Sequence, residues 1–365
     1  MVEKVRVAVV GCGYWGPNLV RNFQALPEAQ LVACCDLDQA ALTRMGQLYP
    51  HARLISEAEQ LFADPTVDAV AIATPARSHY ALARAALLAG KHVLVEKPLA
   101  MTSGEARALT ELAREQGRVL MVGHVFEYHP AVQYIKGMLD AGDLGQVFYL
   151  YSTRVNLGRV QQDINALWSI APHDISILLY LLGQMPEKVS AQGASFLNGR
   201  VEDVVFLTLT FPRSVLAHVH VSWLDPSKAR RLTIVGSRKM VVYDDVADEG
   251  KVKVYDKGVY RKGDEIFGEF QYRVHAGDIA IPKIDMTEPL RLECAHFLAC
   301  VREGKEPRTG GENGERVVRV LEAAQASLDQ GGATVTIPAA GTEGRPQRAS
   351  EDNLERSGGL WNSAS

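Results

Sequence analysis

The sequence has few cysteines, no long apolar run and no strong excess of either charge. Its 365 residues include five cysteines, an odd number, and two of them, Cys34 and Cys35, are adjacent within an apolar run. Neither feature resembles a disulfide framework or the spacing of zinc ligands, so we expect reduced, buried thiols, a cytoplasmic location and no metal site. Apolar runs such as residues 81–89 are far shorter than the roughly 20 residues of a membrane span.

Charge and length narrow the class further. The chain carries 39 Lys and Arg against 43 Asp and Glu, a formal net charge of -4, and no basic patch that would hold nucleic acid or an anionic membrane. The amino terminus leads directly into a strand pattern, so we expect no signal peptide. A length of 365 residues and a hydrophobic fraction of 47% predict a globular chain of two domains.

The first part of the chain alternates short apolar runs with helical patterns. Such alternation predicts a doubly wound parallel sheet with right-handed crossovers, and we place this α/β domain at residues 1–125. The expected strands are 5–10, 31–35, 67–73, 91–95 and 119–122, and the expected helices are 17–26, 39–48, 76–89 and 103–116.

The second part has many strand patterns with few long helices between them. We expect an α+β domain over residues 126–338 with an open, mostly antiparallel sheet, and a disordered tail over 339–365. Residues 251–261 are typical of a hairpin. The expected strands are 146–156, 188–196, 204–211, 215–223, 230–235, 240–243 and 333–337, and the expected helices are 130–139, 174–182, 289–302 and 314–330.

A glycine motif follows the first predicted strand. Gly11, Gly13 and Gly16 form GxGxxG before a helix, which permits a tight turn, a close approach of the backbone to a pyrophosphate and close helix packing. Asp36 stands at the end of the second strand, where a carboxylate binds ribose hydroxyls. No Lys or Arg follows it, so NAD is preferred to NADP. The residues inside the motif, Tyr14 and Trp15, are further candidates for contact with the cofactor.

Polar residues also follow the next two strands of this sheet. Thr74 and Pro75 follow the strand expected at 67–73 and should face the cofactor, whereas His79 is either near the nicotinamide or structural. Glu96 and Lys97 follow the strand expected at 91–95. A lysine there can hold a substrate hydroxyl and help to accept its proton, oriented by the adjacent glutamate, although a surface salt bridge explains the spacing equally well.

Together the glycine motif, Thr74-Pro75 with His79, and Glu96-Lys97-Pro98 resemble the Gfo/Idh/MocA oxidoreductases over residues 4–338. The resemblance implies a Rossmann domain and a second domain whose open sheet covers the active site and builds a homodimer or homotetramer. It also implies an NAD(P)-dependent dehydrogenase that acts on a CH–OH group of a sugar or cyclitol. His124, after the strand expected at 119–122, would lie beside the nicotinamide.

Residues 156–158 and 165–174 look like the branch of this family that acts on UDP-N-acetylated sugars, which includes the WlbA-type 3-dehydrogenases. His173 corresponds to the family's catalytic histidine and would act with Lys97. Many members carry an aspartate where this chain has Ser169, which leaves Lys97 and His173 as the pair. Candidate substrate contacts, for each of which a structural role is an alternative, are Tyr128, Arg154, Asn156, Asn165 and Trp168.

The sequence therefore predicts an NAD-dependent oxidoreductase that transfers hydride between nicotinamide and C3 of a UDP-N-acetylhexosamine or its uronic acid. The same residues would serve an inositol or free-sugar dehydrogenase or a 3-ketosugar reductase. A non-catalytic redox sensor that binds NAD is the alternative from another class. His218 and His220 share one strand face, but with no third ligand nearby a surface or interface role is favoured over a metal.

Overall fold

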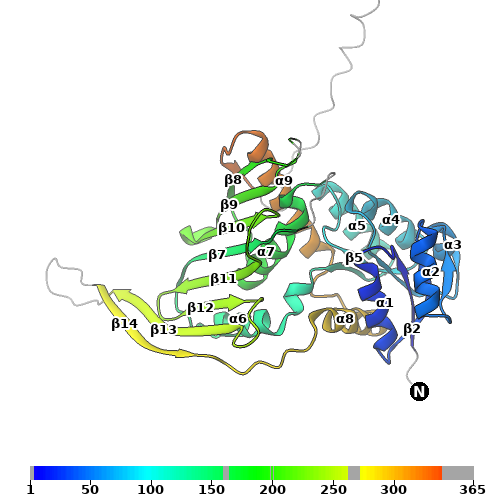
Figure 1. Cartoon of the computed structure of the whole chain (residues 1–365), viewed down its shortest axis with the longest axis horizontal. Coiled ribbons are helices and arrows are strands. Elements are labelled where there is room, and N and C mark those ends of the chain that lie inside the picture. The colour runs from blue at the N-terminus through cyan, green and yellow to red at the C-terminus, as the bar shows by residue number, and fades with distance from the viewer. Residues whose placement is uncertain (1–3, 159–163, 198, 200, 262–271, 339–365) are drawn as a thin grey trace, which may run out of the picture.

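A computed structural model describes residues 4–158, 164–197, 199, 201–261 and 272–338. The tail expected at 339–365 lies outside these residues. Two sheets lie side by side in Figure 1. The antiparallel strands β13 (Val252–Arg261) and β14 (Tyr272–Ala280) form the far end of the larger sheet.

The first sheet has six parallel strands in the order β3-β2-β1-β4-β5-β6, which confirms the predicted doubly wound topology. The chain changes direction across the sheet between β1 and β4, and ligands of such folds bind at this point, beyond the carboxyl ends of the strands. The strands are β1 (Val5–Val10), β2 (Ala29–Cys35), β3 (Arg53–Ile55), β4 (Ala69–Ile72), β5 (His92–Glu96) and β6 (Leu120–Gly123).

Helices connect these strands along the chain, largely as predicted. The segment 76–89, expected as one helix, begins with the 3-10 turn η1 (Ala76–Ser78) before α4. Thr102 caps α5 by accepting a hydrogen bond from the backbone of Glu105 at 3.1 Å. The helices are α1 (Gly16–Ala25), α2 (Gln39–Leu48), α3 (Ala58–Ala63), α4 (His79–Leu88) and α5 (Ser103–Glu115).

The second sheet has nine strands in the order β14-β13-β12-β11-β7-β10-β9-β8-β15. Every pair is antiparallel except β7 with β10, which confirms the expected open, mostly antiparallel sheet. The strands are β7 (Val147–Val155), β8 (Lys188–Ala194), β9 (Val204–Thr210), β10 (Leu216–Ser222), β11 (Ala229–Gly236), β12 (Met240–Asp244), β13 (Val252–Arg261), β14 (Tyr272–Ala280) and β15 (Val335–Thr336).

The hairpin prediction for residues 251–261 was wrong in extent. These residues form the single strand β13, and its antiparallel partner β14 begins only at Tyr272. The mixture of charged and aromatic residues reflects a strand near the sheet edge with much of its surface in solvent, which the pattern alone does not distinguish from a turn.

Three helices contact the second sheet: α6 (Pro130–Asp140), α7 (Ala166–Leu182) and α9 (Gly311–Asp329). The prediction that the middle helix starts at Asp174 was wrong. It begins eight residues earlier, where Asn165 accepts a hydrogen bond from the backbone of Trp168 at 3.1 Å. Pro172 lies inside this helix, although a proline there removes one helical hydrogen bond. Buried side chains such as Leu167, Ala171 and Ile175 hold the helix together by packing.

The last two helices return to the first sheet. In α8 (Pro289–Glu303), Phe297 packs against Phe23 of α1, with ring centroids 6.3 Å apart. In α9, Gly311 and Gly314 lie so close to α5 and β6 that an added Cβ on Gly314 would stand 2.8 Å from Leu99 and Val122. The core of the first sheet therefore includes a helix from beyond residue 126, and the division at 125/126 stays a prediction.

Candidate active site

The glycine turn joins β1 to α1 at the point where the strand order reverses. Gly11 has a φ of +91°, and a Cβ there would lie 2.7 Å from the backbone of Ala73. A Cβ on Gly16 would lie 1.8 Å from the carbonyl oxygen of Gly11, whereas one on Gly13 would meet nothing within 4 Å. The first and third glycines are thus needed for packing, and the second leaves open backbone. The arrangement fits a dinucleotide pyrophosphate before α1, which has no side-chain cap and carries Pro17 in its first turn.

Asp36 ties the end of β2 to this turn. One carboxylate oxygen accepts a hydrogen bond from the backbone N–H of Cys12 at 2.5 Å, and the other accepts one from Asp38 at 2.8 Å. The carboxylate therefore stands beside the turn, where it can also accept from ribose hydroxyls. Leu37 next to it and Tyr14 in the turn are exposed, by 87% and 84%.

Glu96 links the glycine turn to the end of β5. The indole Nε1 of Trp15 donates to one oxygen of Glu96, and the backbone N–H of Lys97 donates to the other at 3.3 Å. Burial raises the pKa of Glu96 to about 7, and the nearby ammonium of Lys97 opposes that rise. Trp15 is thus directed toward the lysine turn, whereas Glu96 binds the backbone of Lys97, so the orientation of the lysine side chain by this glutamate stays a prediction.

His79 joins two loops at the carboxyl edge of the sheet. Its Nδ1 lies 2.7 Å from the carbonyl oxygen of Pro98, and its Nε2 lies 2.9 Å from that of Thr74. Burial lowers the pKa of this ring, and both carbonyls act in the opposite direction. The Lys97–Pro98 bond is cis. This placement favours the structural alternative for His79, which positions the loop of Thr74 and Pro75.

Lys97 reaches across to α7 of the second domain. Its Nζ donates to the carbonyl oxygen of Ser169 at 2.8 Å. His173 lies one turn further along α7, so the amine of Lys97 reaches this helix one turn before His173, near enough for its charge to lower the pKa of that ring. Burial lowers the pKa of Lys97, and Glu96 partly offsets the shift.

His173 lies on α7 rather than at its start. Burial and then the charges of Lys97 and Arg154 lower its pKa well below the ordinary value. A neutral imidazole at neutral pH can accept a proton. Its Nδ1 is buried and has no hydrogen-bond partner among the described residues.

The second sheet supports His173 through an ion pair. Arg154 on β7 donates from Nε to Asp174 at 2.6 Å, and Ser152 donates to the same carboxylate at 2.5 Å. The guanidinium of Arg154 lies 4.4 Å from the ring centroid of Phe126, whose ring meets His173 edge-on at 5.1 Å. Arg154 therefore lies close to His173, but its charge is paired with Asp174, and its predicted contact with substrate stays a prediction.

The remaining predicted contacts have partners in the protein. The hydroxyl of Tyr128 is buried 3.1 Å from that of Thr309. The amide of Asn165 donates to Glu202 at 2.7 Å, and the indole of Trp168 donates to Gln325 at 3.2 Å. These placements favour structural roles. Asn156 is half-buried at the end of β7, over Gly158, and stays a candidate substrate contact.

His124 follows β6 and is buried. Its Nδ1 lies 2.5 Å from the Oδ1 of Asn313 on α9, and the amide nitrogen of Asn313 donates to Glu127 at 3.1 Å. Burial lowers the pKa of His124 to about 4. Asn313 was missed because 189 residues separate it from His124, and no motif surrounds it.

Two buried carboxyl groups belong to this region. Burial raises the pKa of Glu127 to about 8 and that of Glu293 on α8 well above its ordinary value, and the nearby Glu96 raises the second further. The sequence places Glu127 in the loop after residues 119–122, as a candidate for substrate contact or for capping the next helix. Glu293 was missed because it stands in a helical pattern, where glutamate usually faces solvent. Neither oxygen of Glu293 has a hydrogen-bond partner among the described residues.

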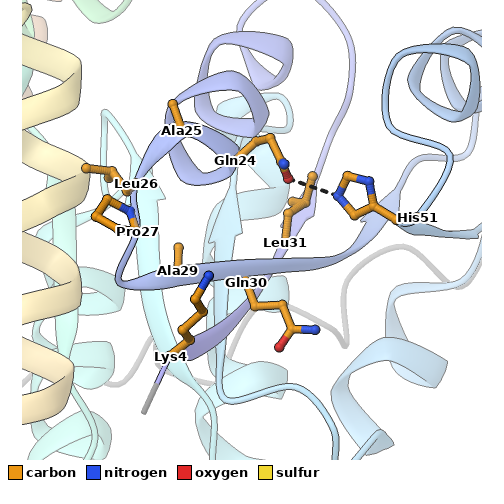
Figure 2. Close-up of a pocket in the computed structure, with 9 residues that line it drawn as sticks. All are labelled: Lys4, Gln24, Ala25, Leu26, Pro27, Ala29, Gln30, Leu31 and His51. Atoms are coloured by element: carbon orange, nitrogen blue, oxygen red, sulfur yellow. Dashed lines mark hydrogen bonds between the residues drawn. The ribbon is translucent and has the colours of Figure 1, made fainter. Parts of the chain in front are cut away.

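The hollow drawn in Figure 2 lies elsewhere. It has a volume of about 250 Å³ and lies by the starts of β1 and β2, where Gln24 and His51 are joined at 2.9 Å. A second hollow of about 520 Å³ is lined by Lys4, Val67 and His92, also at the amino ends of strands. Both are therefore at the opposite edge from the glycine turn and Lys97.

The described residues show no cluster of three metal-ligating side chains, and His218 and His220 lie with Phe206 on the second sheet, the rings of Phe206 and His220 4.4 Å apart. In the same part of the chain, no helix has the length and apolarity to cross a membrane. All five cysteines are buried and unpaired.

The chain is similar in sequence and structure to several sugar and cyclitol dehydrogenases. D-Apiose dehydrogenase of Paraburkholderia graminis is 26% identical over 356 residues, covering 90% of this chain and 89% of that protein. UDP-N-acetylglucosamine 3-dehydrogenase of Acidithiobacillus ferrooxidans is 30% identical over 231 residues, covering 63% and 71%. Its structure superimposes with a TM-score of 0.75 at 26% identity, covering 91% of this chain and 99% of that one. scyllo-Inositol 2-dehydrogenase of Bacillus subtilis is 26% identical, covering 84% and 89%.

Two family models match in succession. Residues 5–124 match the oxidoreductase family with an NAD-binding Rossmann fold, and residues 132–242 match the GFO/IDH/MocA C-terminal domain. These matches confirm the resemblance read from the motifs. Together with the two-sheet fold, they indicate that the glycine turn binds a nicotinamide cofactor. The chain belongs to the Gfo/Idh/MocA oxidoreductase family, and is a dehydrogenase that acts on a CH–OH group with a nicotinamide cofactor.

Proposed function

We propose that the protein transfers hydride between NAD and C3 of a UDP-N-acetylhexosamine or its uronic acid. The observation that carries the proposal is the meeting of Lys97 and α7: the lysine amine bonds to the carbonyl of Ser169, one helical turn before His173. Both side chains thus stand at the carboxyl edge of the first sheet, on the side of the glycine turn.

In this proposal Lys97 holds the substrate hydroxyl, and its positive charge stabilises the oxygen as the proton leaves. His173 is neutral near pH 7 because its pKa is lowered, so it accepts that proton. The carbonyl of Ser169 holds the amine of Lys97, and the carboxylate of Glu96 accepts from its backbone N–H. The bound nicotinamide supplies the hydride acceptor for oxidation, and the same side chains return the proton in the reductive direction.

The preference for NAD over NADP rests on Asp36. Its carboxylate ends β2 beside the glycine turn and is followed by Leu37 and Asp38. A 2′-phosphate at this place would meet a negative charge with no cation to offset it. Comparing the KM values of NAD and NADP in the same assay tests this part of the proposal.

The nucleotide-sugar substrate is supported by residues 156–158 and 165–174 and by the similarity to UDP-N-acetylglucosamine 3-dehydrogenase. The similarity to scyllo-inositol 2-dehydrogenase and D-apiose dehydrogenase supports a second candidate, a cyclitol or free-sugar dehydrogenase. The two differ in one testable respect, because only the first requires the nucleotide.

The experiment measures reduced-nicotinamide absorbance with NAD and UDP-GlcNAc, its uronic acid, myo-inositol or glucose, each with and without 2-oxoglutarate. Reduction, or 2-oxoglutarate-dependent turnover, with a UDP-sugar alone supports the proposal. Reduction only with inositol or glucose transfers it to the second candidate. Silence with all four favours a 3-ketosugar reductase or a non-catalytic sensor. A Lys97→Ala, His173→Ala variant that binds NAD but retains turnover would refute the roles of this pair.

The proposal includes a homodimer or homotetramer built through the second sheet. Its outward face carries exposed Tyr149, Tyr151, Phe206 and Leu216, and contiguous apolar surface of this kind marks an interface. Light scattering tests it: Tyr151→Asp should reduce the mass of the particle. The buried, unpaired cysteines fit the reducing cytoplasm in which we expect the protein to act.

A further inference from the structure

His124 and Asn313 form a contact whose direction is fixed by a third residue. The side-chain amide of Asn313 has one acceptor and one donor end. Its nitrogen donates to Glu127 at 3.1 Å, so its oxygen faces the Nδ1 of His124, 2.5 Å away. Oε1 of Glu127 accepts this bond even when the carboxyl is protonated, provided that the proton is on Oε2, which has no partner among the described residues. The amide oxygen of Asn313 can only accept, so Nδ1 of His124 carries the hydrogen.

Glu127 is held in place to accept the hydrogen bond from Asn313. Its carbonyl oxygen accepts from Arg308 at 3.0 Å, and its side chain is buried next to His124. The direct distance from His124 Nδ1 to Glu127 is 3.9 Å, too long for a hydrogen bond. The asparagine therefore links the two side chains, whose backbones are also joined by a bond from the N–H of Glu127 to the carbonyl of His124 at 2.9 Å, and it joins α9 to the end of β6.

With Nδ1 protonated, a neutral imidazole has its lone pair on Nε2. That atom is buried and has no hydrogen-bond partner among the described residues. Glu96 and Gly123 are paired at the ends of β5 and β6, so Lys97 and His124 leave neighbouring strands at the same edge of the sheet. In keeping with this placement, the ammonium of Lys97 lowers the pKa of His124, and His124 in turn lowers the pKa of His173. The unpaired Nε2 of His124 thus lies in the same buried region as Lys97 and His173.

We propose that Asn313 is a positioning residue: it holds His124 in the Nδ1–H tautomer, so that an acceptor rather than a donor stands beside Lys97. This inference rests on the proposed function of Lys97 and His173. An acceptor stabilises the ammonium, which then holds the substrate oxygen. The other tautomer would place an N–H dipole against the positive charge and weaken that hold.

The first test is direct observation of the tautomer. In protein labelled with ¹⁵N histidine, the ring nitrogens of His124, identified by their loss in His124→Gln, should show a protonated Nδ1 and an unprotonated Nε2. A protonated Nε2 in the wild-type protein would refute the proposal. This measurement needs no sugar substrate, so it separates failure of the tautomer argument from failure of the proposed function.

The second test compares Asn313→Leu with Asn313→Asp. Leucine removes the acceptor, and we expect kcat to fall about tenfold with little change in the affinity for NADH. Aspartate keeps an acceptor for Nδ1, so it should restore the tautomer and most of kcat, and add a pH-dependent limb as His124 gains a higher pKa. The control is Glu312→Gln on the exposed side of α9, where the glutamate pairs with Arg114.

Turnover is measured with the substrate that the panel identifies. A leucine variant with unchanged kcat would overturn the proposal, as would equal losses in the leucine and aspartate variants. If the leucine variant does not fold, the wild-type tautomer and the pH profile of the aspartate variant still decide the question.

Discussion

The ion pair between Arg154 and Asp174 permits a quantitative prediction. Both residues are almost completely buried, at 8% and 2% exposure, and they are joined by two hydrogen bonds of 2.6 and 3.3 Å. Replacing Asp174 by alanine would leave a guanidinium without its partner next to His173, and would free the hydroxyl of Ser152. Breaking a buried pair in this way costs about 3–5 kcal/mol, so we expect a loss of that size in the free energy of unfolding.

Urea denaturation followed by tryptophan fluorescence measures this loss. The double variant Arg154→Met, Asp174→Leu removes both charges and fills the space with apolar side chains, so it should recover most of the stability. The stability losses of Arg154→Met alone and Asp174→Leu alone, added together, should therefore greatly exceed the loss of the double variant. A loss below about 1 kcal/mol for Asp174→Ala, or additive losses in the double variant, would show that the charges are not confined as the distances indicate.

Other predictions follow from the same geometry. Gly13→Ala should weaken NAD binding in isothermal titration without lowering Tm, whereas Gly16→Ala should lower Tm because its Cβ would overlap the carbonyl of Gly11; the reverse order would contradict the assigned packing. Because the pKa of His173 is lowered from 6.5, kcat/KM for oxidation should hold as pH falls through 6.5 and decline only below it, and a limb at or above 6.5 would count against a buried base. Burial raises the pKa of Glu127 from 4.5 to about 8, so between these values the folded protein retains a proton that the unfolded chain has lost, and stability falls as pH rises. Glu127→Gln should thus gain stability relative to wild type from pH 5 to pH 8, by up to ~1.4 kcal/mol per pH unit, and a constant difference in chemical denaturation would argue against a protonated Glu127.

Features that follow from local sequence were predictable. The glycine turn, Asp36 and Lys97 all stand at the ends of apolar strand runs, and parallel strands bring such ends to one edge. β3 was missed because it has only three residues and none is buried, so it produces no apolar run. These successes and failures depend on residues that are close together in the chain.

Features set by packing over long distances were not predictable. The start of α7 was misplaced because Pro172 reads as a helix start, while the burial of the preceding turns outweighs the lost hydrogen bond. Asn313 and Glu293 belong to the surroundings of the proposed catalytic pair only because α8 and α9 return to the first sheet. Nothing in their neighbourhood along the chain distinguishes them from surface residues of an amphipathic helix.

The return of α8 has a consequence for synthesis on the ribosome. Phe297, Leu290 and Cys294 cover apolar side chains of β1 and α1, which leave the ribosome long before α8 does. At ordinary rates of translation, the interval between the end of β6 and the start of α8 lasts on the order of 10 to 30 s. During that time the finished first sheet has an apolar side with no cover. The nascent cofactor-binding half is therefore a natural client for a chaperone, and its release depends on the last quarter of the chain.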